Sequence, residues 1–154
     1  EYDADGKVAQ LGEVSLDLLK ELNANPFFSN SIPKSLGMEF VFEEVIPLIN
    51  TFELEIKDIL ATYVEHIAFQ ISKQLLNSEG KMIITGGGAF NSFLIRTIKK
   101  YTTNIEIERP NAEIINYKEA LIFAFLGILK LKGEINVLSS VTGAERDHSS
   151  GMVL

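Results

Sequence analysis

The sequence predicts an α/β domain in which a sheet is flanked by helices. Two short apolar strands, around residues 81–85 and 105–107, alternate with longer segments of helical periodicity. Strands that alternate with helices are typical of α/β layer structures rather than all-helical proteins. With 154 residues, of which 46% are hydrophobic and 23% charged, the chain has the size and composition of one ordinary globular domain. We therefore expect residues 1–154 to form a single domain.

The N-terminal third predicts two helices separated by a loop. Apolar residues recur at helical spacing from Val14 to Leu22. This helix should end before Pro26, because the residue that precedes a proline is pushed out of the helical region. Residues 25–37 combine prolines and a glycine with Ser and Asn, which is typical of a loop. A second, poorly defined helix is expected over residues 40–47.

The clearest helix is expected from Glu53 to Leu76, where apolar residues form one broad stripe at three- and four-residue steps. Thr51 is its predicted N-cap, because the hydroxyl can accept a hydrogen bond from a free amide of the first turn. The first strand, Lys81–Thr85, follows and runs directly into three consecutive glycines. A helix from about Asn91 to Tyr101 comes next.

The C-terminal part predicts a second strand around residues 105–107 and a last helix from Asn116 to Leu131. That helix is apolar nearly all round, so we expect it to be buried. Its longest apolar run, Ala120–Leu129, is shorter than the about 20 residues that a membrane-spanning helix needs. We therefore expect no membrane partner. The apolar residues of the tail, residues 136–154, show neither helical nor strand periodicity.

Charge and composition exclude several function classes. The chain has 14 Lys and Arg against 21 Asp and Glu, so its formal net charge is −7, and this balance argues against a nucleic-acid partner. Cysteine is absent, which excludes disulfides and thiolate metal sites, and we predict no metal site. The polar, acidic start is unlike a secretory signal, so a cytoplasmic location is expected. Adjacent residues cannot form a triad as Asp147-His148-Ser149 would require, so we discount a hydrolase.

The glycine turn at Gly86, Gly87 and Gly88 is the most informative feature of the sequence. It lies between a strand and a helix start, where glycines let the backbone approach a ligand and the helix N-terminus offers free amides and positive dipole charge. The sequence matches neither a Walker A loop nor the dinucleotide-binding G-x-G-x-x-G pattern. It therefore predicts an anion or nucleotide site, with a tight connection in which the glycines only relieve crowding as the open alternative.

Glu119 has two interpretations at the start of the last predicted helix. With Asn116 as the N-cap, Glu119 stands at the third helical position and would complete a capping box. Alternatively, its carboxylate faces a cleft and accepts hydrogen bonds from the polar groups of a substrate. The residues alone favour the cap.

Four segments, taken in order, resemble the C-terminal half of the anhydro-N-acetylmuramic acid kinase family. They are Asp5-Gly6-Lys7-Val8-Ala9 with Gly12-Glu13-Val14, Asn25-Pro26-Phe27-Phe28 with Pro33-Lys34-Ser35, Ile84-Thr85-Gly86-Gly87-Gly88-Ala89-Phe90-Asn91, and Glu119-Ala120 with Ser140-Val141-Thr142-Gly143-Ala144. The resemblance spans essentially the whole chain, and the order and spacing of the segments are more specific than any single motif.

The resemblance implies one lobe of the two-lobed sugar kinase, Hsp70 and actin architecture, which is ribonuclease H-like and closes around ATP and Mg²⁺. It implies cleavage of the 1,6-anhydro ring of anhydro-N-acetylmuramic acid with phosphorylation of O6, which gives N-acetylmuramic acid 6-phosphate in cell-wall recycling. Gly86, Gly87, Gly88 and Asn91 would then bind the nucleotide, and Glu119 would contact the sugar. A homodimer is also implied.

The family's phosphate loop and general-base aspartate lie upstream of the segment where this chain begins. The resemblance therefore implies that residues 1–154 are the C-terminal lobe, that no catalytic residue lies within them, and that an N-terminal lobe is their partner. We expect the chain alone to be inactive. A nucleotide-binding or sensing module without catalysis, and a structural domain whose glycines are merely a turn, are the alternatives.

Overall fold

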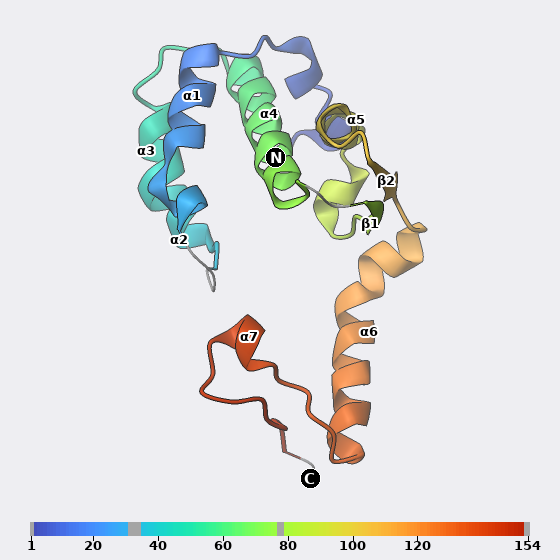
Figure 1. Cartoon of the computed structure of the whole chain (residues 1–154). Coiled ribbons are helices and arrows are strands. Elements are labelled where there is room, and N and C mark those ends of the chain that lie inside the picture. The colour runs from blue at the N-terminus through green and yellow to red at the C-terminus, as the bar shows by residue number, and fades with distance from the viewer. Residues whose placement is uncertain (1, 31–34, 77–78, 153–154) are drawn as a thin grey trace. The chain divides into compact units, whose positions relative to one another are not determined.

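The computed structural model describes residues 2–30, 35–76 and 79–152. It contains two compact units, one formed by residues 1–30 and 36–110 and the other by residues 31–35 and 111–154. The first unit carries both strands and most of the helices (Figure 1). Its elements are α1 (Leu16–Ala24), α2 (Met38–Phe40), α3 (Ile46–Ile49), α4 (Ile56–Gln74), β1 (Gly80–Ile83), α5 (Ser92–Tyr101) and β2 (Ile105–Glu108).

The predicted strands pair in parallel and confirm the α/β class. Gly80 lies opposite Ile105, and Ile83 lies opposite Glu108, so the described sheet has two strands in register over their whole length. A parallel pair needs a crossover connection, and α5 provides it between β1 and β2. The carboxyl ends of both strands therefore meet at the same edge of the sheet.

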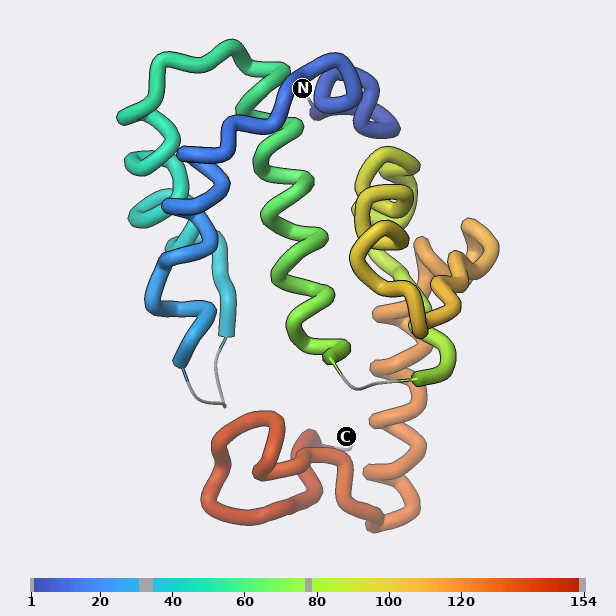
Figure 2. Tube along the Cα trace, turned by 45° about the horizontal axis from the view of Figure 1, so that its top comes forward, coloured from blue at the N-terminus to red at the C-terminus, as the bar shows by residue number. Residues whose placement is uncertain are grey.

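α4 is the central helix of this unit and lies between α1 and α5 (Figure 2). Leu18 and Leu22 of α1, together with Val45, form a fully buried core. The half-buried apolar side chains that pack against this core are Phe40, Val41, Leu48, Ile49, Phe52, Leu54 and Tyr63. Burial of an apolar stripe accounts for the helical periodicity that the sequence shows.

The poorly defined helix predicted over residues 40–47 is part of a longer helical stretch. The α2 and α3 segments are joined by a π-helical segment, Val41–Val45, and the stretch runs on to Ile49. A π-helical turn adds a residue to each turn and shifts the apolar positions out of the ordinary period. Pro47 follows the π-helical segment at the start of α3, and the helical stretch continues past it to Ile49, so it does not end the helix there.

Thr51 is not the N-cap of α4, and that prediction is wrong. Its hydroxyl donates a hydrogen bond to the carbonyl oxygen of Leu48 at 2.7 Å, so Thr51 belongs to the end of the preceding helix. α4 begins only at Ile56, after an extended Glu55 whose side chain makes no capping hydrogen bond. A threonine hydroxyl can accept a hydrogen bond from an amide that follows it or donate one to a carbonyl that precedes it. Thr51 donates to the preceding carbonyl of Leu48.

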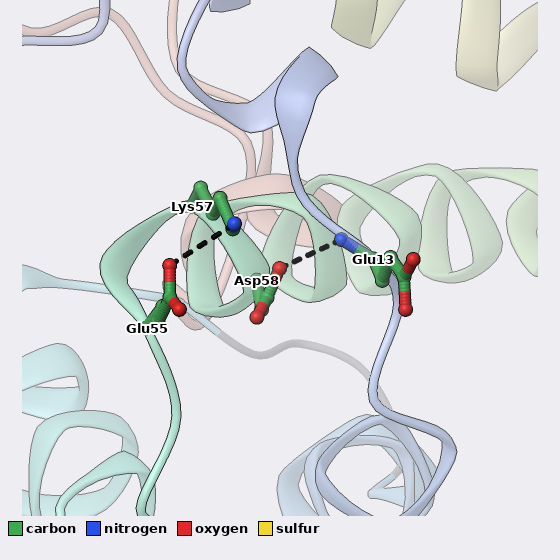
Figure 3. A network of polar contacts seen from close by, with 4 residues as sticks. All are labelled: Glu13, Glu55, Lys57 and Asp58. Carbon is green, nitrogen blue, oxygen red and sulfur yellow. Dashed lines mark hydrogen bonds and ion pairs between the residues drawn. The ribbon is translucent and has the colours of Figure 1, made fainter.

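The chain before α1 crosses the start of α4 at close range (Figure 3). The amide of Glu13 donates to Asp58 Oδ1 at 2.8 Å, and Lys57 Nζ pairs with Glu55 Oε2 at 3.0 Å. Gly12 lies directly against the backbone of Lys57, so that a Cβ there would overlap the Lys57 carbonyl group. Glycine at residue 12 is therefore required by close approach of two backbone segments.

The second unit contains α6 (Ala112–Leu131), α7 (Ser139–Thr142) and the C-terminal tail. α6 begins before the predicted Asn116, because Asn111 accepts the hydrogen bond of the Ile114 amide at 2.9 Å and acts as the N-cap. The helix is also not buried as expected. The exposed apolar side chains of α6 are Ile114, Tyr117, Leu121, Ile122, Phe123, Phe125, Ile128 and Leu131.

The exposure of α6 has a simple physical reason within its unit. The described elements that could cover it are one short helix and a tail closed by a single bridge between Val137 and His148. These are too few to enclose a helix that is apolar nearly all round. Across residues 2–30, 35–76 and 79–152, no helix combines the length and apolar character that crossing a membrane requires.

Candidate functional site

The glycine turn follows β1 as predicted. Gly86 follows β1 after Ile84 and Thr85 and precedes a 3₁₀ turn formed by Gly87–Phe90. α5 then begins at Ser92. The turn is closed by hydrogen bonds from the Ala89 amide to the Gly86 carbonyl at 3.0 Å and from the Asn91 amide to the Gly88 carbonyl at 3.1 Å. Ala89 is fully buried and anchors the turn to the unit, while the glycines before it stay at the surface.

Glycine is favoured at residue 86 by its backbone conformation, and not by a lack of space for a side chain. Gly86 has φ 80° and ψ 178°, a combination that residues with a side chain hardly adopt. A Cβ at Gly86 or Gly87 would meet no atom within 4 Å, and one at Gly88 would meet only the flexible end of Leu94 at 3.7 Å. Open space therefore lies beside the turn. The alternative that glycine is needed here to relieve crowding has no support at Gly86 and Gly87.

The amide donors are distributed differently from the sequence prediction. The Ser92 amide, at the start of α5, donates to Asp5 Oδ1 at 2.8 Å, and the Leu94 amide donates to Asn91 Oδ1 at 2.9 Å. The start of α5 is thus already capped by a carboxylate and an amide oxygen. In the described part of the chain, the amides of Gly87 and Gly88 have no hydrogen-bond partner. The donors available to a ligand are therefore on the turn itself.

Arg109 is a basic side chain at this edge that the sequence prediction did not include. Its Nη1 donates to the carbonyl oxygen of Ala89 at 3.4 Å, and its side chain is exposed. Arg109 follows β2 directly, Gly86 follows β1 after Ile84 and Thr85, and the carboxyl ends of parallel strands share one edge. The Arg109-Pro110 pair after a predicted strand was the signal that could have found it. A guanidinium beside free backbone amides favours an anion.

Glu119 is not part of a capping box, and that interpretation is wrong. It is the eighth residue of α6, well beyond the first turn that Asn111 caps. Its side chain is exposed. Asn116, the predicted cap, lies inside the helix. Glu119 belongs to the second unit, whereas Gly86, Gly87, Gly88 and Asn91 are brought together on one turn of the first unit.

The two histidines have no place in this site. His66 is only 4% exposed, and its Nδ1 lies 2.7 Å from Asn23 Oδ1, which also accepts from Gln70 Nε2 at 2.8 Å. Because an amide oxygen can only accept, Nδ1 carries the proton in this arrangement. Burial lowers the pKa of His66 to about 4, so the ring stays neutral near pH 7. His148 is exposed and lies in the tail.

The described residues do not form a metal centre by themselves. No group of three or more His, Asp or Glu side chains that could hold a metal ion is found in the described parts of the chain. Mg²⁺ is usually held by one or two carboxylates together with substrate phosphates and water, so these residues would not hold the ion without such partners. Pro33 and Lys34, which belong to the family-like segment, lie outside the described residues.

A comparison with protein families gives a match over the full sequence. The family model described as "Anhydro-N-acetylmuramic acid kinase" (AnmK) matches residues 1–154. The match covers the whole chain and so includes the glycine turn, Arg109 and Glu119.

Proposed function

The chain belongs to the anhydro-N-acetylmuramic acid kinase family, and from this premise we propose that it supplies the nucleotide-binding part of such a kinase. The proposed reaction opens the 1,6-anhydro ring of anhydro-N-acetylmuramic acid with water and phosphorylates O6 with ATP. Its product would be N-acetylmuramic acid 6-phosphate. The observation that carries the proposal is the exposed glycine turn, with free amides at Gly87 and Gly88 and open space beside them.

The chemistry of the turn suits a polyphosphate. Backbone amides donate to phosphate oxygens without a side chain between them, and the turn places two such donors next to each other. Arg109 adds a full positive charge at the same edge. Phosphoryl transfer depends on positioning and on stabilisation of charge by donors and Mg²⁺. In this proposal Gly86, Gly87, Gly88 and Arg109 hold the nucleotide, and Asn91 fixes the end of the turn.

We further propose that residues 1–154 act as the C-terminal lobe of the two-lobed sugar kinase, Hsp70 and actin architecture. A second lobe would carry the phosphate loop and the general base, so residues 1–154 alone would be inactive. Two observations support a larger assembly, namely the sheet of two described strands and the exposed apolar side chains of α6. Parallel sheets and all-round apolar helices are normally covered on every face. We also propose, from the family membership alone, that the full protein is a homodimer and acts in the cytoplasm.

Replacing Gly87 with valine tests the nucleotide site. A side chain at residue 87 has room in the fold but would project into the space that the ligand needs, so stability should hold while binding weakens. We expect the dissociation constant of ATP–Mg²⁺ for the two-lobed protein to rise at least about tenfold, or about 1.4 kcal/mol. Isothermal titration calorimetry measures this change directly.

Lys99→Val is the control for this measurement. Lys99 is exposed in the last turn of α5, so this variant also places a valine at the surface of the first unit, but away from the glycine turn. It should bind ATP like the wild type. An unchanged affinity of folded Gly87→Val protein would contradict the proposed nucleotide site.

Glu119 is proposed to contact the sugar, since the structure leaves it no role as a cap. Replacing Glu119 with glutamine keeps the size of the side chain but removes its charge, and we expect kcat/KM for the anhydro-sugar to fall about tenfold. The free energy of unfolding should change by less than about 0.5 kcal/mol, because the residue is exposed. Glu113→Gln, in the first turn of the same helix, is the control. Equal kinetic losses in both variants would refute the assignment.

A nucleotide-binding or sensing module without catalysis is the second candidate, because the open glycine turn and Arg109 would suit a bound nucleotide whether or not catalysis follows. The two candidates differ in their product. Mass spectrometry of the two-lobed protein with ATP, Mg²⁺ and the anhydro-sugar should detect a phosphorylated sugar. ATP binding without that product would favour the sensing module.

A further inference from the structure

We propose that Asp5 is a positioning residue for the glycine turn, because its carboxylate fixes the Asn91–Ser92 end of the turn from a distant part of the chain. The inference rests on the proposed function, in which this turn binds ATP. Asp5 does not touch the ligand in this proposal. It acts through Ser92 and Asn91 on the amides of Gly87 and Gly88.

The first observation is the bond between Asp5 and the start of α5. Asp5 Oδ1 accepts the hydrogen bond of the Ser92 amide at 2.8 Å, although the two residues are 87 positions apart. Asp5 has φ 61°, the positive value that residues other than glycine adopt uncommonly. Such a conformation persists only where the surrounding structure holds it in place. The hydrogen bond from the Ser92 amide stabilises Asp5 in this conformation.

The second observation is the close packing of Gly6 on the N-cap of α5. Gly6 is buried with φ 71°, and a Cβ there would overlap Asn91 Oδ1 and lie 2.7 Å from Phe93 Cβ. The backbone of Gly6 therefore lies directly against the Asn91 side chain. That side chain also accepts from the Leu94 amide. Asn91 is thus fixed between the N-terminal segment and the first turn of the helix.

The third observation connects these contacts to the glycines. The amide of Asn91 donates to the Gly88 carbonyl at 3.1 Å, so the residue beside Ser92 is bonded to the last glycine of the turn. One turn further along α5, Arg96 Nη2 donates to Gln10 Oε1 at 2.5 Å. The N-terminal segment thereby holds α5 at two points. A shift of Ser92 or Asn91 has to move Gly88.

The charge of Asp5 also decides where an anion can bind. Hydrogen bonds from Ser92 lower the pKa of Asp5, so the carboxylate stays ionised and occupies the positive end of the α5 dipole. A phosphate placed at the start of α5 would meet this negative charge. The amides of Gly87 and Gly88 are the donors that Asp5 leaves open.

The test compares two replacements of Asp5. Asp5→Gly removes the carboxylate while allowing the positive φ, and Asp5→Asn keeps an acceptor oxygen and tolerates the left-handed region. For Asp5→Gly in the two-lobed protein we expect the dissociation constant and the KM of ATP to rise about fivefold, with kcat changed by less than about twofold. Amide hydrogen exchange over residues 86–92 should become faster. Asp5→Asn should restore the exchange rate to near the wild-type value and, because it removes a negative charge beside the site, should bind ATP at least as tightly as the wild type.

Asp3→Ala is the matched control. Asp3 accepts hydrogen bonds from the Val8 and Ala9 amides at 2.8 and 2.9 Å, so this variant loses two amide bonds in the same segment but no contact with α5. It should leave ATP affinity unchanged. A second variant, Ser92→Pro, removes the donor from the other side of the bond at the first helical position, where proline is tolerated. It should weaken ATP binding as Asp5→Gly does, and the double variant should be little worse than either.

The outcomes separate the two proposals. A wild-type protein that binds no ATP would remove the proposed function, while hydrogen exchange at residues 86–92 would still report whether Asp5 holds the turn. Unchanged exchange and ATP affinity in folded Asp5→Gly protein, or losses equal to those of Asp3→Ala, would overturn the role of Asp5. If Asp5→Gly does not fold, failure of Ser92→Pro to change exchange and ATP affinity would overturn it in the same way.

Discussion

Replacing Gly12 with alanine is expected to lower the free energy of unfolding by about 3 kcal/mol and the melting temperature by about 10 °C. The backbone angles of Gly12, φ −89° and ψ 164°, suit any residue, so strain at residue 12 itself is not the cause. The cause is the added Cβ, which would overlap the Lys57 carbonyl group and lie 2.8 Å from the Asp58 nitrogen. Backbone atoms cannot rotate away as a side chain can.

The separation needed to admit this methyl group would also break the neighbouring bonds. The Glu13 amide bond to Asp58, drawn in Figure 3, and the bond from the Ser15 amide to Thr62 Oγ1 at 2.9 Å both join the same two segments. Thermal and urea unfolding followed by circular dichroism measure the loss. Gly87→Ala makes the same change in open space and should melt within about 2 °C of the wild type. A Gly12→Ala protein as stable as this control would refute the close approach.

Lowering the pH from 7 to 4 is expected to remove about 3 kcal/mol of stability through His66 alone. Burial lowers the pKa of His66 from 6.5 to about 4 in the folded protein. Between these two values the unfolded chain takes up a proton that the folded chain does not bind, so unfolding becomes easier as the pH falls. Above pH 6.5 both states are neutral and the full stability is present. Below the folded pKa, both are protonated and the loss stops growing.

Replacement of His66 with glutamine should flatten this dependence, because glutamine does not titrate. Urea unfolding at half-unit steps from pH 7 to 4 gives the slope, and His148→Gln serves as a control that removes an exposed imidazole. Glu44 lines the small cavity beside His66, so Glu44→Gln tests whether its carboxylate contributes. Asp5 and Asp147, whose pKa values are lowered by hydrogen bonds, lose their contributions only below about pH 4. A slope that survives in His66→Gln protein would contradict the assignment.

Local features of the sequence were enough to predict several elements of the structure. The apolar stripe of α4, the strands β1 and β2, and the start of α5 next to Asn91 all follow from the spacing of apolar residues and from turn residues. Two predictions that failed, Thr51 and Asn116 as caps, concern helix ends, whereas the third, burial of the last helix, concerns what packs against it. Several polar side chains near an end can cap it, and Asn111 was an equally suitable cap five residues before Asn116.

Taken alone, the sequence determined the α/β class, the glycine turn between β1 and α5, and the family to which the chain belongs. The tertiary structure decided which amides of that turn remain open. Asp5 reaches Ser92 across 87 positions, and Arg109 reaches the turn through the pairing of β1 with β2. Periodicity and turn chemistry act over a few residues, whereas these contacts exist only because packing brings distant segments together.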